Sequence, residues 1–313
     1  MHYRGVLDLL DPYIILAGLG VGFVVGLTGM GGGALMTPLL VLLFGVPPLT
    51  AVSSDIVAAM VMKPVGGVVH WKRGTVNLKL VGWLVAGSVP SAFLGVLLLR
   101  EFGAGPDLQA RVKVALGMAL LVVTVGLVIR PLLARRRKPG DSLIPLHVRS
   151  LPTLLIGIIG GLVVGLTSVG SGSLMMILLL LLYPRLKLSE LVGTDLVQAV
   201  PLVASAALGH LLFGDFELGL TGSIIIGSLP GVFLGARFSS RAPDYVIRPA
   251  LIVVLLASGL KLLSVSTGLL ATAVGTAAAI GVAHGVIEAR REREARQELE
   301  GASAGGPLPA PEI

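Results

Sequence analysis

Residues 26–38 read Gly-Leu-Thr-Gly-Met-Gly-Gly-Gly-Ala-Leu-Met-Thr-Pro and lie inside an apolar run, residues 12–44. Because glycine costs about 1 kcal/mol per residue in a helix relative to alanine, this density of glycine predicts that a helix breaks here. Inside a bilayer, irregular backbone survives only where it is buried in protein or lines a polar cavity. The free amides at such a break, and the N-terminus of the helix that follows it, attract anions.

A second interruption repeats the first. Residues 165–175 read Gly-Leu-Thr-Ser-Val-Gly-Ser-Gly-Ser-Leu-Met and align with the first stretch at a constant spacing, Gly26 with Gly165 and Thr28 with Thr167. Further identities recur at a nearly equal spacing, namely Asp55 with Asp195, His70 with His210, Gly74 with Gly214, Ser88 with Ser228, Pro90 with Pro230 and Gly95 with Gly235. This register indicates a duplicated chain, and interrupted apolar segments at matching positions of two halves point to the binding site of a transporter.

The composition is typical of a polytopic membrane protein. The chain is 54% hydrophobic and 13% charged, whereas a soluble domain is about 25% charged. Its long apolar runs favour membrane helices over the alternating strands of an outer-membrane barrel. The net charge of +7 is explained by basic residues that flank the spans, so we expect a lipid bilayer and no nucleic acid as partner. The chain has no cysteine, no metal-ligand spacing and no phosphate loop, and we therefore predict no metal, no cofactor and no enzymatic activity.

The apolar runs divide the chain into four parts. We predict a first membrane repeat over residues 12–130, a basic linker over 131–150, a second repeat over 151–263, and an additional C-terminal helix with a charged, partly disordered tail over 264–313.

The orientation follows from the basic residues. Runs 12–44 and 151–183 are equally long, and each is long for one membrane crossing and short for two. If each is a single crossing, the 24 Lys and Arg split almost evenly; if each is a re-entrant hairpin, 18 lie on one side, five on the other and Lys63 in the membrane. Since Lys and Arg collect in the cytoplasm, the second arrangement predicts an external N-terminus and a cytoplasmic linker and tail. Each half then has one hairpin and three spans, and an odd number of spans inverts the halves.

The two breaks contain most of the predicted substrate-binding residues. Glycines at four-residue spacing, Gly18, Gly22 and Gly26, fit close helix packing. The denser glycines do not fit it, and we expect them to expose amides beside the hydroxyls of neighbouring Ser and Thr, a donor set that suits an oxyanion. These residues are Thr28, Gly29, Gly31, Gly32, Gly33, Thr167, Ser168, Gly170, Ser171, Gly172 and Ser173.

Two acids follow the breaks, each behind a small polar residue. Asp55 follows Ser54, and Asp195 follows Thr194. One interpretation is N-capping of the next helices. The other places the acids deeper in the membrane, where an acid is expensive and usually functional. On the second interpretation both belong to the substrate site with Ser54, Thr194 and Gln198, and both are candidates for proton coupling.

Three further titratable residues have two interpretations each. Lys63 lies near the middle of its run, where a charge needs a cavity or a partner. It either attracts the anion directly or forms a salt bridge or snorkels; direct pairing with Asp55, eight residues away, is not expected. His70 and His210 end their runs and are either boundary residues or proton-coupling candidates.

These residues together resemble the sulfite exporter TauE/SafE family of anion permeases. The likeness rests on Gly29-Met30-Gly31-Gly32-Gly33 with Pro38, then Ser53-Ser54-Asp55, His70 and Gly74, repeated more weakly in the second half. It covers about residues 12–263 and implies a bacterial or archaeal inner-membrane permease for sulfite or organosulfur anions. The second half departs from the pattern, with Ser168 and Ser171 where the first has Gly29 and Gly32.

The predicted protein is therefore all-helical, with two inverted repeats and one extra C-terminal helix. We expect it to act as a secondary transporter of a small sulfur-containing oxyanion by alternating access, with proton coupling as a hypothesis. A channel-like or regulatory membrane protein is the alternative. The faces of small residues are compatible with a homodimer.

Overall fold

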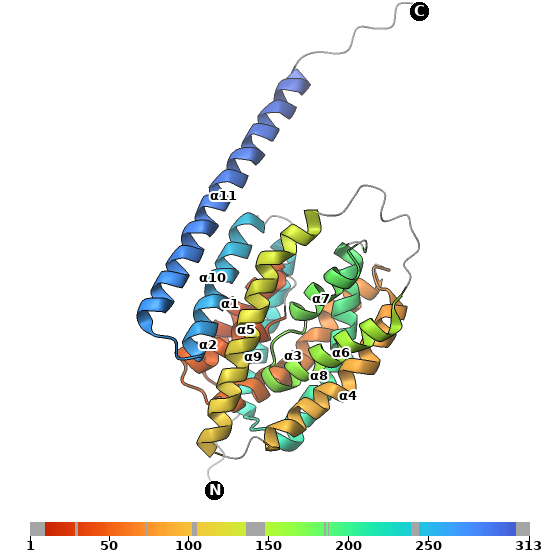
Figure 1. The fold of residues 1–313 in the computed structure, drawn as a ribbon, viewed down its shortest axis with the longest axis vertical. Coiled ribbons are helices and arrows are strands. Elements are labelled where there is room, and N and C mark those ends of the chain that lie inside the picture. The colour runs from red at the N-terminus through yellow and green to blue at the C-terminus, as the bar shows by residue number, and fades with distance from the viewer. Residues whose placement is uncertain are drawn as a thin grey trace, which may run out of the picture.

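The computed structural model describes residues 10–28, 31–72, 74–101, 105–135, 148–184, 186, 188–238 and 244–304, and every regular element in these ranges is an α-helix. The first half contains α1 (Pro12–Thr28), α2 (Gly33–Leu43), α3 (Pro48–Lys72), α4 (Leu78–Glu101) and α5 (Gly105–Arg135). The second half contains α6 (Ser150–Thr167), α7 (Leu174–Leu182), α8 (Leu188–Phe213), α9 (Leu218–Phe238) and α10 (Asp244–Leu262), and α11 (Thr267–Ala304) follows (Figure 1).

Both predicted interruptions are present. Helix α1 ends at Thr28 and α2 begins at Gly33, while α6 ends at Thr167 and α7 begins at Leu174. The second break bends through left-handed backbone, with φ of 60° at Ser168, 115° at Gly170 and 131° at Gly172. Left-handed backbone is unfavourable for residues with a Cβ, so Ser168 is held there by its surroundings.

Each broken segment packs tightly against a helix of the opposite half. A Cβ built on Gly22 of α1 would lie 2.5 Å from the carbonyl oxygen of Ser228 in α9. In the equivalent place, a Cβ on Gly161 of α6 would lie 2.4 Å from the carbonyl oxygen of Ser88 in α4. The predicted close packing of Gly18, Gly22 and Gly26 is thus confirmed, because glycine lets the backbones touch.

Helices α3 and α8 pack against one another at the centre. The C-terminal half of α3 lies against the N-terminal half of α8, since a Cβ on Gly67 would contact Leu196 and Val200. At the other ends, Ser53 of α3 lies 2.8 Å from His210 of α8, so the two helices run in opposite directions. Around them, apolar residues from both halves form one buried cluster, which includes Val52, Leu84, Val164, Leu179 and Leu202.

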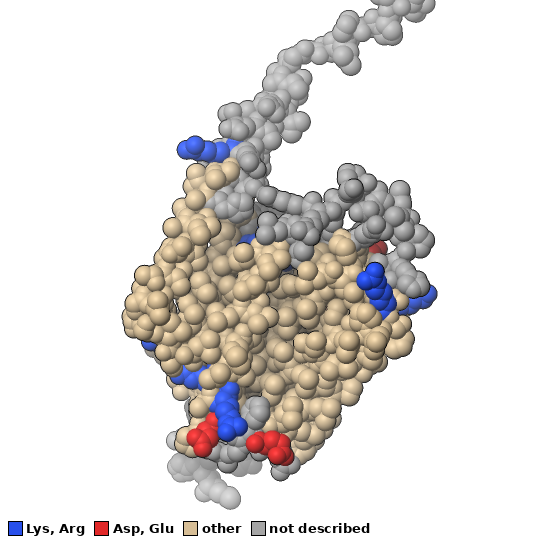
Figure 2. All heavy atoms as spheres, in the orientation of Figure 1, with Lys and Arg blue, Asp and Glu red and all other residues tan. Residues whose placement is uncertain are grey.

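Eight helices are long and apolar enough to cross a membrane within the described residues: α3, α4, α5, α6, α8, α9, α10 and α11. Helices α1 and α2 are apolar but shorter. Figure 2 shows a broad uncharged surface with charged side chains at its margins, as expected for a protein whose flanks face lipid. Helix α11 lies beside α10 and extends past the bundle (Figure 1), and none of its apolar part is buried.

Candidate functional site

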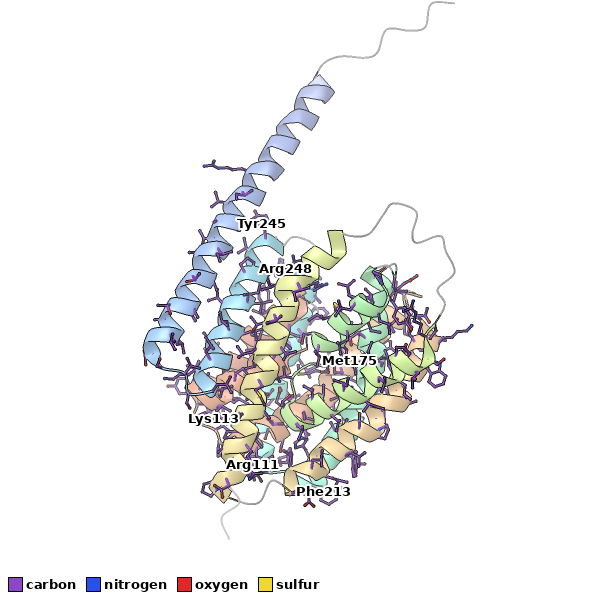
Figure 3. The ribbon with its side chains drawn as sticks, viewed as in Figure 1. Arg111, Lys113, Met175, Phe213, Tyr245 and Arg248 are labelled. Atoms are coloured by element: carbon purple, nitrogen blue, oxygen red, sulfur yellow. The ribbon has the colours of Figure 1, made fainter. Side chains whose placement is uncertain are left out.

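The two interruptions touch one another in the interior. A Cβ on Gly31 would lie 2.3 Å from the carbonyl oxygen of Ser171, and a Cβ on Gly33 would lie 2.1 Å from that of Ser168. The first helical residues of α2 and α7, Gly33 and Leu174, are both buried, and Met175 of α7 lies in the middle of the bundle (Figure 3). The first amides of each helix have no acceptor within that helix, so two positive helix ends are brought into the same region.

Asp55 connects the two breaks. Its Oδ2 accepts hydrogen bonds from Thr37 Oγ1 of α2, at 2.8 Å, and from Ser168 Oγ of the second break, at 2.6 Å. Asp55 is buried, and two hydroxyl donors on one oxygen offset part of the cost of burying its charge. Asp55 lies seven residues after α3 begins at Pro48, so the N-capping interpretation is wrong.

Asp195 has different surroundings in the second half. Its Oδ1 accepts a hydrogen bond from Gln198 Nε2 at 3.1 Å. Its Oδ2 is the one buried side-chain oxygen or nitrogen among the described residues that has no hydrogen-bond partner. Asp195 is only 1% exposed, and α8 begins at Leu188, so this acid is no N-cap either. An unsatisfied buried carboxylate oxygen is costly and calls for an explanation.

Lys63 lies where the breaks meet. Its Nζ donates a hydrogen bond to the carbonyl oxygen of Ser171 at 2.5 Å and lies 3.3 Å from the position of a Cβ on Gly31. The side chain is 8% exposed. It interacts electrostatically with Asp195 and Asp55, yet no carboxylate of the described residues lies within salt-bridge distance of Nζ. The snorkelling interpretation is wrong for this buried side chain, whereas the ion-pair and anion-binding interpretations both stay predictions. With one hydrogen bond to Ser171, the ammonium has donors left for another acceptor.

His210 is not a boundary residue. It is fully buried, its Nδ1 lies 2.8 Å from Ser53 Oγ, and its Nε2 lies 2.8 Å from the carbonyl oxygen of Gly165 at the end of α6. Ser53 Oγ also accepts a hydrogen bond from the amide of Asp215. His210 therefore joins α3, α6 and the α8–α9 turn. His70 is only partly buried, and its Nδ1 lies 3.0 Å from Thr75 Oγ1.

Four of the predicted hydroxyl groups make hydrogen bonds away from the region where the two breaks meet. Thr28 and Thr167 donate to carbonyls of their own helices, Val24 and Val163. Ser54 and Thr194 accept hydrogen bonds from the amides of Glu217 and Asn77, which lie at equivalent positions of the two halves. Gly32, Gly170, Gly172 and Ser173 are buried in or beside the breaks, and Gly29 lies outside the described residues.

Two residues that donate hydrogen bonds to the polar side chains of the site were not predicted as site residues. Thr37 gives Asp55 a donor, and Ser88 Oγ donates to Gln198 Oε1 at 3.4 Å. Thr37 lies one helical turn after the glycines, and this position could have identified it as a residue that faces the break.

The charged side chains of the site, Asp55, Lys63 and Asp195, are buried. Two surface hollows of about 620 Å³ and 300 Å³ have apolar linings, one between α10 and α11 and one among α3, α4 and α8. Neither is lined by Lys63 or the two acids. The site is a packed polar cluster buried among the helices.

A helical membrane protein whose interrupted segments bury polar groups between two halves has the architecture of a membrane transporter. The sequence profile described as "Sulfite exporter TauE/SafE" matches residues 14–262, and the chain belongs to this family.

Its relatives are named as transporters. "Probable membrane transporter protein YjnA" of Bacillus subtilis (strain 168) is 41% identical over 252 residues, which are 80% of this chain and 98% of the relative. "Probable membrane transporter protein YdhB" of the same organism is 26% identical over 251 residues, 80% of this chain and 99% of the relative. No solved structure matches the chain.

Proposed function

We propose that this protein is a secondary transporter for a small sulfur-containing oxyanion, such as sulfite or an organosulfonate, and that the anion binds beside Lys63 where the two breaks meet. The observation that carries this proposal is the buried ammonium. Lys63 Nζ donates a hydrogen bond to the carbonyl oxygen of Ser171 in one break and lies against Gly31 of the other. A buried cation next to two helix N-termini attracts a negative solute.

The donor set supports an oxyanion in particular. Amides at the starts of α2 and α7, the hydroxyl of Ser171 and the ammonium of Lys63 point to hydrogen-bond acceptors on the ligand. The acids Asp55 and Asp195 keep the site from holding the anion too tightly for release. The close contacts of Gly31 and Gly33 favour a ligand of few atoms, and the family name supports sulfite or a related anion.

The helix directions support inverted halves and alternating access. Helices α3 and α8 occupy equivalent positions and run in opposite directions where they touch. The equivalent helices α5 and α10 pack together, and Arg111 and Lys113 near the start of α5 lie at the opposite end from Tyr245 and Arg248 near the start of α10 (Figure 3). Equivalent helices that pack antiparallel are related by an axis across the bundle, as in inverted repeats.

The orientation can be tested because the chain has no cysteine. The basic residues favour a cytoplasmic linker and tail in the plasma (inner) membrane, with the N-terminus outside. Asp107 of α5 and Val246 of α10 are exposed and lie at equivalent positions of the two repeats. A membrane-impermeant maleimide is expected to label Asp107→Cys in intact cells and Val246→Cys only after permeabilisation. Labelling of both from one side would contradict inverted repeats.

The substrate class is tested with purified protein in detergent. Sulfite, sulfate, thiosulfate, sulfoacetate and taurine are compared with nitrate, acetate and phosphate in a thermal-shift assay. An anion at 100 times its Kd stabilises the folded state by about 2.7 kcal/mol, so a true ligand raises Tm by several degrees. Saturable counterflow of that anion in proteoliposomes then supports a carrier, whereas ohmic current would indicate a channel. No shift with any sulfur anion would contradict the proposal.

A further inference from the structure

The two buried acids of the site have unequal surroundings. Asp55 Oδ2 accepts hydrogen bonds from two hydroxyl groups, whereas Asp195 Oδ2 accepts no hydrogen bond. We propose that Asp195 takes up one proton together with each anion, while Asp55 remains a fixed carboxylate. This inference rests on the anion site proposed above.

The repeat explains why the acids differ. The donors to Asp55 are Thr37 and Ser168. In the register that aligns the two breaks, Thr37 corresponds to Met176 and Ser168 corresponds to Gly29. Neither counterpart has a hydroxyl, so the second half lacks the donors that satisfy the acid of the first. The duplicated fold thus keeps both carboxylates but supplies hydroxyl donors to the Oδ2 of only one of them.

The charges around Asp195 determine how this acid responds when an anion binds. From α3, Lys63 and Asp55 face the site; from α5, the half-buried Arg130 interacts more weakly with Asp195. The charged residues described at the ends of α4, Lys79 and Glu101, are exposed, and α6 and α7 contain no charged residue. The fully buried charges are therefore two carboxylates and one ammonium.

A bound monoanion adds a negative charge to a site that already has an excess of one. In a medium of low dielectric this repulsion is large, and it is relieved when a proton from water binds Asp195 Oδ2 and converts the carboxylate to a carboxylic acid. Since linkage is reciprocal, protonation strengthens anion binding by the same factor as the anion strengthens protonation. Anion and proton would then cross together.

The experiment measures the pH dependence of anion affinity in wild type and in Asp195→Asn. Sulfate and methanesulfonate serve as probes because they keep a fixed charge across the neutral range. For one linked proton, wild-type affinity is expected to fall about tenfold per pH unit above the midpoint of the linked titration. Asp195→Asn is expected to bind with the affinity of protonated wild type and to vary less than about twofold with pH. In a weakly buffered solution with a pH dye, wild type takes up about one proton per anion and the variant none.

Controls separate the possible failures. Asp195→Ser provides a second uncharged variant if Asp195→Asn does not fold, and Lys261→Met at the exposed end of α10 is expected to keep the pH dependence. If wild type binds neither these two probes nor any sulfur anion of the thermal-shift screen, the proposed function fails. Two results would overturn the assignment to Asp195 while the anion site stands. One is anion binding by wild type without proton uptake, and the other is a pH dependence that survives in both Asp195 variants.

Discussion

Lys63→Met is expected to weaken anion binding by about 100-fold. Methionine keeps the length and apolar volume of the side chain but removes the ammonium, which lies between the two breaks and bonds to Ser171. Losing a buried charged partner costs about 3 kcal/mol in binding, a factor of about 100 in Kd. Isothermal titration of the detergent-solubilised protein with the anion identified by thermal shift gives this difference directly.

A matched substitution and a double variant make this result specific. Lys261→Met makes the same change at the exposed end of α10 and is expected to bind like wild type. Lys63→Met leaves Asp55 and Asp195 without their buried cation and should also lower Tm. Adding Asp195→Asn removes one of those charges, so the double variant is expected to recover Tm but not binding. Wild-type affinity in folded Lys63→Met would show that the ammonium is structural.

The interruptions could be predicted from the sequence because their cause is local. Glycine density breaks a helix wherever it occurs, and both breaks lie where residues 26–38 and 165–175 place them. The contact between the breaks could not be predicted in this way. It depends on Gly33 packing against Ser168, a contact between residues far apart in sequence that no spacing encodes.

For the two acids, too, part of the role could be predicted from the sequence and part could not. The repeat predicts Asp55 and Asp195 as site candidates, and the capping alternative is wrong because α3 and α8 each begin seven residues before the acid. Pro48 is the first residue of α3, and proline is favoured at that position, so the sequence did contain the signal. The difference between the acids required coordinates, since only hydrogen bonds show that Thr37 and Ser168 both serve Asp55.

Gly33→Ala is expected to disrupt the contact between the breaks with the smallest possible side chain. Its Cβ would lie 2.1 Å from the carbonyl oxygen of Ser168 and 2.6 Å from its Oγ, the donor to Asp55. Overpacking of this kind costs about 1–3 kcal/mol, and here it also moves the hydroxyl that holds the acid. We therefore expect a lower Tm and loss of anion binding, although alanine is the better helix former.

The control for this change is Gly20→Ala in α1. A Cβ at Gly20 has no neighbour within 4 Å, so the same substitution there gains about 1 kcal/mol of helix propensity without a clash. Thermal unfolding and anion titration of both variants separate the contact from the propensity: Gly20→Ala should match or exceed wild-type Tm, and Gly33→Ala should fall below it. If Gly33→Ala keeps both Tm and affinity, the two breaks do not need their close contact, and a site built from both of them would no longer be supported.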